Sequence, residues 1–226
     1  MSAAALFTRT LAVLALMLAL ALPGMAAAWS AAPMIANAAP IQPFRLEPAT
    51  GRYLVATESM TDPRFRRSVI LIVSHDDDGT LGIIINRPGR ISATSLGEGF
   101  RDDRLRFGGP VEPRKLSMLF RDPAVISRAQ AEAADEDAAP PMLNVRDDLS
   151  FVLGRHAVTE VHGRLDPSAP RRIYAGYAGW GPGQLGAELR RGSWYLIEDD
   201  PALAFADEDP ALLWTRLIRR MQGSWI

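Results

Sequence analysis

The chain contains two neighbouring runs of apolar residues, a pattern typical of strands that are buried on both faces. Residues 68–74 and 81–86 are rich in β-branched side chains and lie either side of an Asp-Gly turn at Asp78 and Gly79. This arrangement predicts a central β-hairpin, and the Arg-Pro-Gly segment that follows ends it. Shorter apolar runs predict further strands at residues 53–56, 105–110, 115–120, 143–145, 150–153, 172–177 and 193–197.

A helix is predicted over residues 182–191. Its apolar residues Leu185 and Leu189 lie four apart on one face, Pro182 falls in the first turn, and Gly192 follows the end. The three glycines of this region, at 181, 183 and 186, also spell G-x-G-x-x-G after a predicted strand.

Those glycines do not predict a dinucleotide site. The motif stands near the end of the chain, with no further strand-helix units behind it to build a dinucleotide fold. Pro182 also lacks the backbone N–H that such a loop offers to phosphate. We interpret the stretch as a sharp strand-to-helix turn that lets aromatic side chains pack against bare backbone. An anion site at the helix N-terminus remains an open alternative.

The last helix is predicted after Asp209, which is expected to be its N-cap, with Leu213, Leu217 and Met221 on one stripe. Residues 155–162 also favour a short helix, and the alanine-rich acidic residues 129–141 favour a surface loop. Many strands and few helices in irregular order predict one α+β domain.

The N-terminus has the three parts of a secretory signal peptide. Residues 1–28 carry one charged residue, Arg9, then an apolar run and the small residues that end at Ala28. The apolar run of residues 11–22 rises about 18 Å as a helix, which is short for a hydrocarbon core of about 30 Å. We therefore expect export to the periplasm or beyond, with cleavage near Ala28 or after Ala39.

Two alternatives stay open for this segment: an uncleaved anchor, which would be the chain's one contact with a membrane, and a true start at Met34, which would leave the protein cytoplasmic. Residues 29–50 are rich in alanine and proline and are expected to be a flexible lead-in. The folded domain is then expected to occupy residues 51–226.

The charge and the cysteine content of the chain exclude several classes of function. The net charge is −1 and the isoelectric point is about 6.3, so no basic face for direct nucleic-acid binding is indicated. The chain has no cysteine, which excludes disulfides, thiolate metal sites and a cysteine nucleophile.

No catalytic or metal constellation emerges from the motifs. Ser74, His75 and Asp76 are consecutive, so strand alternation points His75 away from the other two and the three cannot form a relay. His156 and His162 are six apart and lie on different faces of a helix. We therefore expect no catalytic residue, no metal and no cofactor.

Two polar or aromatic features remain to be explained. Asn86 and Arg87 follow a buried strand and either line a pocket or cap the hairpin, and the Asn-x-Pro sequence favours capping. Trp180, Trp194 and Trp214 are predicted to form an aromatic cluster in the core, or an interface if part of it is exposed.

Several blocks of the chain, taken in order, resemble the YqgE/AlgH family of small bacterial proteins. The matching blocks are residues 53–56 (YLVA), 60–69, 82–88 (GIIINRP), 107–111 (FGGPV), 176–185 (GYAGWGPGQL) and Trp194. The resemblance implies a single α+β domain over residues 51–226, with a small barrel-like mixed β-sheet and surrounding helices. Members are often labelled transcriptional regulators and usually lack a signal peptide, so the leader of this chain departs from the family.

Three functions are compatible with this resemblance. The first is a non-enzymatic regulatory or binding protein that acts through a protein partner and is exported here. The second is an enzyme that binds a small molecule or anion in a pocket where turn-rich blocks converge. The candidate residues of that pocket are Asn86, Arg87, Gly108, Gly109, Trp180 and Gly181. The third is a cytoplasmic transcriptional regulator whose start is misassigned.

Overall fold

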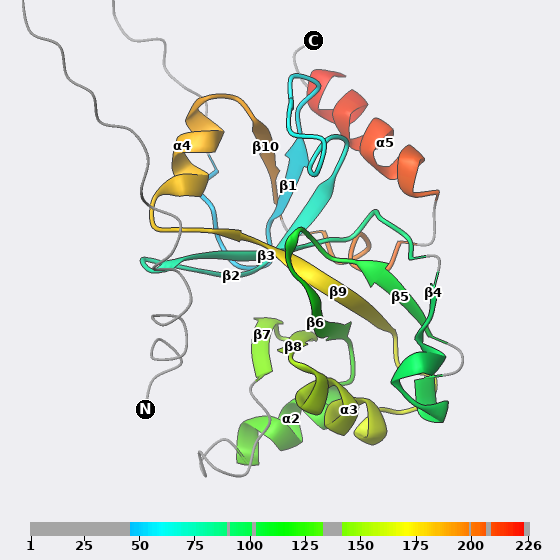
Figure 1. Cartoon of the computed structure of the whole chain (residues 1–226). Helices are drawn as coiled ribbons and strands as arrows, with labels where there is room; N and C mark the ends of the chain where they lie inside the picture. Colours follow the sequence, from blue (N-terminus) through cyan, green and yellow to red (C-terminus); the bar gives the residue numbers. More distant parts are fainter. Residues whose placement is uncertain are drawn as a thin grey trace, which may run out of the picture. The chain divides into compact units, whose positions relative to one another are not determined.

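The computed structural model describes residues 46–89, 91–100, 103–132, 142–198, 200–206 and 209–223. From Leu46 onward the chain forms one structural unit with an α+β fold (Figure 1). The expected signal peptide at residues 1–28, and the lead-in as far as residue 45, lie outside the described residues.

Ten strands belong to one sheet. They are β1 (Tyr53–Ala56), β2 (Val69–Asp76), β3 (Gly79–Ile84), β4 (Ile91–Ser92), β5 (Arg104–Phe107), β6 (Val111–Phe120), β7 (Met142–Arg146), β8 (Leu149–Leu153), β9 (Arg171–Trp180) and β10 (Trp194–Ile197). The helices are α2 (Pro123–Glu132), α3 (Arg155–Arg164), α4 (Gln184–Arg190) and α5 (Pro210–Gly223), with short 3₁₀ turns at Ala93–Leu96 and Glu98–Phe100.

The main path through the sheet runs β10-β1-β2-β3-β9-β6-β8-β7, and β4 and β5 join it beside β9. β9 is the strand on which the sheet is organised, because it pairs with β3 near its end, with β6 along most of its length and with β5 in parallel. β2 and β7 stand five places apart in the order and still come into contact. The sheet therefore curls over on itself, in keeping with the expected barrel-like form.

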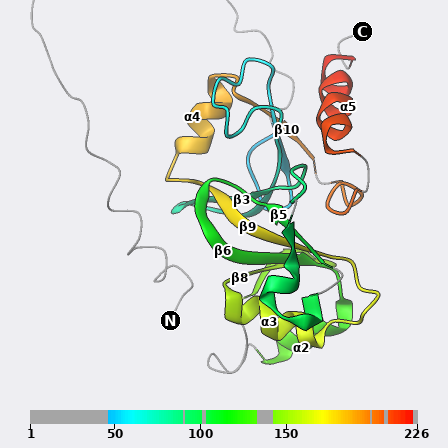
Figure 2. The same ribbon diagram turned by 45° about the vertical axis from the view of Figure 1, so that its right-hand side comes forward.

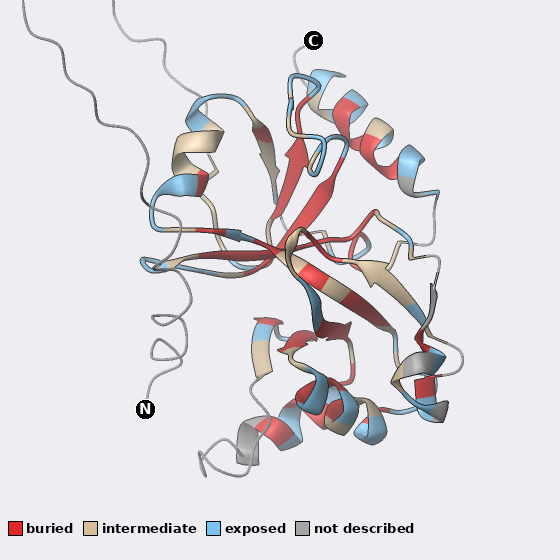
Figure 3. Ribbon diagram, viewed as in Figure 1, coloured by how far each residue is buried: buried red, intermediate tan, exposed pale blue. Residues whose placement is uncertain are grey.

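Three apolar clusters hold the helices against this sheet. α5 packs with Leu213, Trp214, Leu217 and Ile218 on the largest cluster, while α2 and α3 share a second cluster on the other face of β6, β8 and β9. α4 contributes Leu185 to a third cluster with β1 and β2. Figure 2 shows α2 and α3 lying together beneath β6 and β8, and Figure 3 shows burial concentrated along β1 and β2 and on one face of α5.

The predicted central hairpin is confirmed as β2 and β3, which pair antiparallel from Ile70 with Ile84 to Asp76 with Gly79. The predicted last helix is confirmed as α5, and Asp209 Oδ1 accepts a hydrogen bond from the Ala211 N–H at 2.8 Å, as expected of an N-cap.

Three details differ from the sequence-based expectations. The expected loop at residues 129–141 begins inside α2, which continues to Glu132, and residues 133–141 lie outside the described part. Val125, Ile126 and Ala129 give that helix its buried face.

The helix expected from Pro182 begins at Gln184, because Gly183 adopts a left-handed φ of 70° and serves as the N-cap. Trp214 does not join Trp180 and Trp194: it lies in the largest cluster, and its indole N–H donates to the Ala56 carbonyl at 2.7 Å.

Candidate functional site

Asn86 acts as a clip on the start of β2. Its Oδ1 accepts a hydrogen bond from the Val69 N–H at 2.8 Å, and its Nδ2 donates to the Arg67 carbonyl at 2.9 Å. The side chain is 7% exposed, so these partners replace water that it has lost. The contacts agree with the capping interpretation of Asn86.

The side chain of the next residue, Arg87, contacts the same segment that leads into β2. Its guanidinium donates to the Arg66 carbonyl at 3.3 Å and sits over the Phe107 ring at 5.7 Å from the centroid. Burial lowers the pKa of Arg87, and the charge of Asp62 acts in the opposite direction. The guanidinium is thus packed between the segment that precedes β2 and Phe107 of β5.

Gly108 and Gly109 permit a close approach between backbones. The Gly108 N–H donates to the Ala175 carbonyl at 2.9 Å, and its carbonyl accepts from Ile84 at 2.8 Å. A Cβ at Gly108 would meet the Gly176 carbonyl oxygen, and one at Gly109 would meet the backbone of Tyr177. Both glycines are therefore required by packing between strands.

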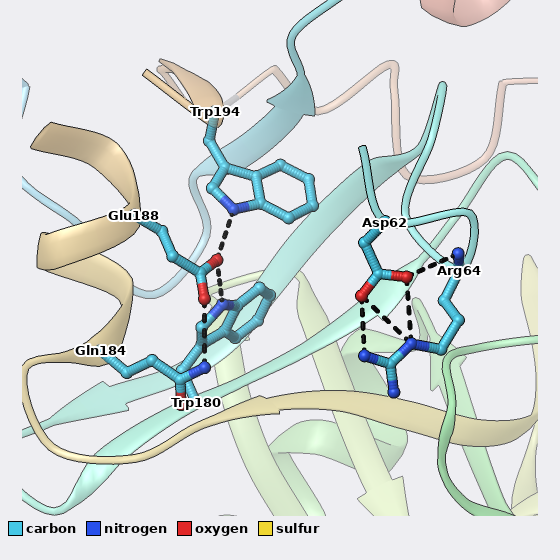
Figure 4. A network of polar contacts seen from close by, with 6 residues as sticks. All are labelled: Asp62, Arg64, Trp180, Gln184, Glu188 and Trp194. Atoms are coloured by element: carbon cyan, nitrogen blue, oxygen red, sulfur yellow. Dashed lines mark hydrogen bonds and ion pairs between the residues drawn. The ribbon is translucent and has the colours of Figure 1, made fainter. Parts of the chain in front are cut away.

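Trp180 belongs to an aromatic cluster with Phe65 and Trp194, at centroid separations of 6.3 and 6.0 Å. The two indole N–H groups both donate to Glu188 Oε2, at 3.0 Å from Trp180 and 2.8 Å from Trp194 (Figure 4). Gln184 donates to the other oxygen of the same carboxylate at 3.1 Å. Trp180 is 5% exposed, so the cluster is a support for α4 rather than an open surface.

Gly181 donates its N–H to Gln184 Oε1 at 3.1 Å, and a Cβ there would meet nothing within 4 Å. The register pairs Thr80 with Trp180, so Gly181 lies beside the start of β3, whereas Asn86 and Arg87 follow its end. Gly108 bonds to Ile84, so Gly108 and Gly109 lie near Asn86 and Arg87, whereas Trp180 and Gly181 lie beside the start of β3. A cavity in the described part of the chain is lined by other residues.

That cavity has a volume of about 320 Å³ and lies beside β5 and β9. It is lined by Asp103, Arg104, Arg106, Pro170, Arg171, Arg172, Ile173 and Phe205. Among these described lining residues, four are arginines and one is an aspartate, in a protein whose net charge is −1. We call this cavity the arginine pocket.

The register of β5 on β9 explains why the arginines gather. The strands run parallel with Leu105 beside Ile173 and Arg106 beside Tyr174, so residues at these paired positions point to the same face. Leu105 and Ile173 pack in the cluster beneath α3, while Tyr174 points into the cluster beneath α5. The arginines at 104, 106 and 172 therefore share the face that Phe205 covers.

Arg172 is held firmly at the inner end. Its side chain is 7% exposed and donates to the carbonyls of Ala204 at 3.1 Å and Ala206 at 2.6 Å, and it lies 5.8 Å from the Phe205 ring centroid. These two carbonyl groups fix the orientation of the guanidinium.

Asp103 lies between the guanidinium of Arg171 and the imidazole of His162 at the outer wall. Its Oδ1 lies 3.3 Å from Arg171 Nε and its Oδ2 lies 2.8 Å from His162 Nε2. His162 also packs on the Phe100 ring at a centroid distance of 4.1 Å. Asp103 is thereby engaged with both Arg171 and His162.

Tyr174 lies behind the pocket, next along β9 from Ile173. It is completely buried, and its hydroxyl has no hydrogen-bond partner of good geometry among the described residues. Burial raises the pKa of Tyr174, and the nearby charges of Arg172 and Arg106 partly offset that rise.

The remaining sequence motifs have structural roles. His75 Nδ1 shares a hydrogen bond with Thr80 Oγ1 at 2.7 Å, and Asp76 Oδ1 accepts from the backbone of Asp78 and Gly79, each at 3.0 Å, as a hairpin turn requires. Among the described residues, no group of three or more His, Cys, Asp or Glu side chains is placed to hold a metal ion. Within the same ranges, none of the helices has the length and apolar character needed to cross a membrane.

Sequence reasoning missed the arginine pocket. Its signal is the alternation of arginine in residues 104–107 (RLRF) and the pair at Arg171 and Arg172, which stand far apart in the chain. The two segments meet only through the parallel pairing of β5 with β9, which no local pattern predicts.

Comparison with known proteins gives consistent matches over this domain. A family model described as AlgH-like matches residues 53–226. A UPF0301 protein from Streptomyces avermitilis is 35% identical over 184 residues, which cover 77% of this chain and 87% of the relative. Another from Paracoccus denitrificans is 37% identical over 169 residues, covering 71% and 83%.

Solved structures show the same fold. The crystal structure of protein DIP2367 from Corynebacterium diphtheriae superposes with a TM-score of 0.61 at 27% identity, covering 78% of this chain and 89% of that one. The solution structure of the AlgH protein from Pseudomonas aeruginosa gives a TM-score of 0.57 at 24% identity, covering 78% and 92%.

Proposed function

Because the chain belongs to the AlgH-like family, we propose that it is a non-enzymatic regulatory protein that binds an anionic ligand in the arginine pocket and acts through a protein partner. The observation that carries this proposal is the composition of the pocket wall, with four arginines and one aspartate around about 320 Å³. A pocket of that volume is at the small end of the range for ligand sites in proteins.

The geometry supports binding through charge. Arginine presents a planar fork of donors that matches the oxygens of phosphate and carboxylate groups, and such contacts strengthen where water is excluded. Phe205 supplies an apolar side to the wall, which lowers the local dielectric around the buried Arg172.

The charged side chains of the pocket form ion pairs and hydrogen bonds within the fold, which favours a binding role over a catalytic one. Asp103 orients Arg171 and His162, and Arg172 holds the turn at residues 204–206. The enzyme alternative built on Asn86, Arg87, Gly108, Gly109, Trp180 and Gly181 is not favoured, since those residues clip, pack or cap separate parts of β3 and β9.

A calorimetric titration tests the proposal. Wild type is titrated with citrate, inorganic phosphate, pyrophosphate and AMP, and we expect at least one to bind with a Kd below about 1 mM. Arg106→Gln should weaken that binding, whereas Arg190→Gln, on the exposed end of α4, should not. Absence of binding across the panel, or equal binding by Arg106→Gln, would overturn the proposal.

A separate measurement tests whether the protein is non-enzymatic. After long incubation with the protein, the ligand is recovered and its phosphorus or proton NMR spectrum is expected to be unchanged. Turnover by wild type that Arg106→Gln loses would instead identify an enzyme.

We also propose that residues 1–28 direct export and are removed. Fractionation of the host, with the mass of the mature N-terminus, tests this: a periplasmic chain starting near Trp29 or Pro40 supports it. A cytoplasmic chain starting near Met34 would contradict export and restore the transcriptional-regulator alternative.

A further inference from the structure

We propose that the outer edge of β10 is an interaction surface for a second copy of this chain. The β10 strands of two copies pair antiparallel about a twofold axis, and the two sheets become continuous. This inference goes beyond the proposed function, because it depends neither on the arginine pocket nor on its ligand.

The backbone of β10 has one edge without a partner. β10 stands at one end of the strand order, and β1 is its one paired neighbour within the described ranges (Figure 1). The Thr57 N–H donates to the Ser193 carbonyl at 3.1 Å, so the alternation of an antiparallel ladder turns the backbone of Tyr195 toward β1 as well. The N–H and C=O groups of Trp194 and Leu196 therefore face away from β1, along the outer edge.

Burial also marks β10 as a strand that lacks a neighbour. All four residues of β1 are 0% exposed, whereas three of the four residues of β10 are only half-buried. Both strands contribute side chains to the same two apolar clusters, the one with α5 and the one with α4, so the two faces of each strand are covered alike. The difference therefore arises at the edge, where Tyr195, Leu196 and Ile197 keep apolar surface that a further strand would cover.

Opposite charges at the two ends of β10 favour a second copy as that further strand. Arg190 and Arg191 precede β10, and Glu198 follows it. All three side chains are exposed, and none of them forms an ion pair or a hydrogen bond with another described residue. Antiparallel pairing of two copies sets each basic end beside the partner's acidic end, whereas parallel pairing would set arginine beside arginine.

The outward-facing backbone groups restrict the register of this pairing. Residues that exchange hydrogen bonds across an antiparallel ladder lie directly opposite each other, so Trp194 pairs with the partner's Leu196 and Tyr195 lies on the twofold axis. This register uses both outward-facing residues of β10. It also sets Glu198 opposite the residue that follows the partner's Arg191, within reach of that long side chain.

The contact is small, because the new ladder uses only the four residues of β10 from each copy. Interfaces of this size are weak and reversible, so we expect a dimer with a Kd on the order of 10 µM. Its flanking charges are exposed, and added salt should therefore weaken the association.

Analytical ultracentrifugation of the chain purified from its host measures the association at protein concentrations from about 1 to about 500 µM. Arg191→Glu and Glu198→Arg should each raise the dimer Kd at least about tenfold, because each change sets like charges against each other twice across the axis. The variant that carries both changes should return to within about threefold of wild type. Arg128→Glu, which makes the same change of charge on the exposed face of α2, is the matched control and should not alter the Kd.

Amide hydrogen exchange locates the contact. In a dilute sample the N–H groups of Trp194 and Leu196 should exchange faster than that of Tyr195, and a concentrated sample should protect them. A monomer at every concentration overturns the proposal, as does an association that the variant with both changes fails to restore. Protection of Trp194 and Leu196 in the dilute sample would show that the chain itself covers this edge. Protection that rises with concentration only elsewhere would place the interface on another surface, and either result also overturns the proposal.

Discussion

The side-chain amide of Asn86 donates to the backbone carbonyl of Arg67 at 2.9 Å, and Arg67 holds a positive φ of 56°. A left-handed backbone is unfavourable for a side chain other than glycine, asparagine or aspartate. The oxygen of the same amide accepts a hydrogen bond from the Val69 N–H. Asn86 therefore fixes the conformation of Arg67 and also pairs the first backbone N–H of β2.

Replacing Asn86 by alanine should destabilise the domain by about 2–3 kcal/mol, because the buried Val69 N–H then loses its partner. Urea denaturation followed by circular dichroism measures the change. Gln222→Ala is the control: Gln222 is exposed and donates to the exposed Glu58 at 2.8 Å, so less than about 1 kcal/mol is expected there. Equal losses in both variants would show that Asn86 has no special role.

Glu188→Ala should cost about 2 kcal/mol, because it leaves two indole N–H groups without their shared acceptor. Glu188→Gln keeps one side-chain oxygen and should cost less than half as much. Tryptophan fluorescence during denaturation reports the cluster directly. Glu160→Ala, which removes a surface pair with Arg164 on α3, should cost about 0.5 kcal/mol; a larger loss there than in Glu188→Ala contradicts the argument.

Strands could be predicted from the sequence where the local preference of the side chains for β structure is strong. β2 and β3 are rich in β-branched residues and meet at an Asp-Gly turn, so their pairing follows from local preference. α2 was not predicted because its three buried residues are followed directly by the alanine-rich acidic stretch, which obscures the apolar stripe.

The site was less predictable than the fold. Asn86 was correctly interpreted as a cap, since a polar side chain at the end of a buried strand seeks backbone partners. The arginine pocket could not be found because Arg106 and Arg172 come together through long-range parallel pairing, and the sequence carries no mark of that register.

Gly108 and Gly181 were both candidate pocket residues, but replacing each by alanine should affect the stability of the domain differently. Gly108→Ala places a Cβ against the Gly176 carbonyl and should cost about 3 kcal/mol or prevent soluble expression. Gly181→Ala meets nothing within 4 Å and should change stability by less than about 0.5 kcal/mol. Thermal unfolding of both variants compares them, and a large loss in Gly181→Ala would show that the glycine stretch has a further constraint.

Tyr174→Phe should be neutral or stabilising by up to about 1 kcal/mol, because it removes a buried hydroxyl that lacks a well-formed hydrogen bond within the described part of the chain. Tyr53 is equally buried, but its hydroxyl donates to the Asp200 carbonyl at 3.2 Å, so Tyr53→Phe should cost about 1 kcal/mol. Urea denaturation at pH 7 measures both. The reverse order would show that Tyr174 has a partner of real energetic weight.

Stability should fall as the pH rises above about 10. Burial raises the pKa of Tyr174, so the unfolded chain loses this proton at lower pH than the folded chain. The unfolded state then binds fewer protons, and linkage makes the free energy of unfolding decrease with pH. Tyr174→Phe should show a shallower decrease between pH 9 and 11 in urea denaturation, although not a flat one, because burial also raises the pKa of Tyr177. An unchanged slope would contradict the assignment.

The pairing of β1 with β10 determines when during translation the sheet can be completed. Tyr53 pairs with Ile197 and Ala56 with Trp194, so β1 obtains this neighbour only after the intervening strands β2 to β9 have been made. Until then the nascent chain carries apolar strands without their final neighbours, which slows folding and exposes it to chaperones. Under the export proposed above, this delay would keep the polypeptide unfolded, and so able to cross a membrane, until β10 has been made.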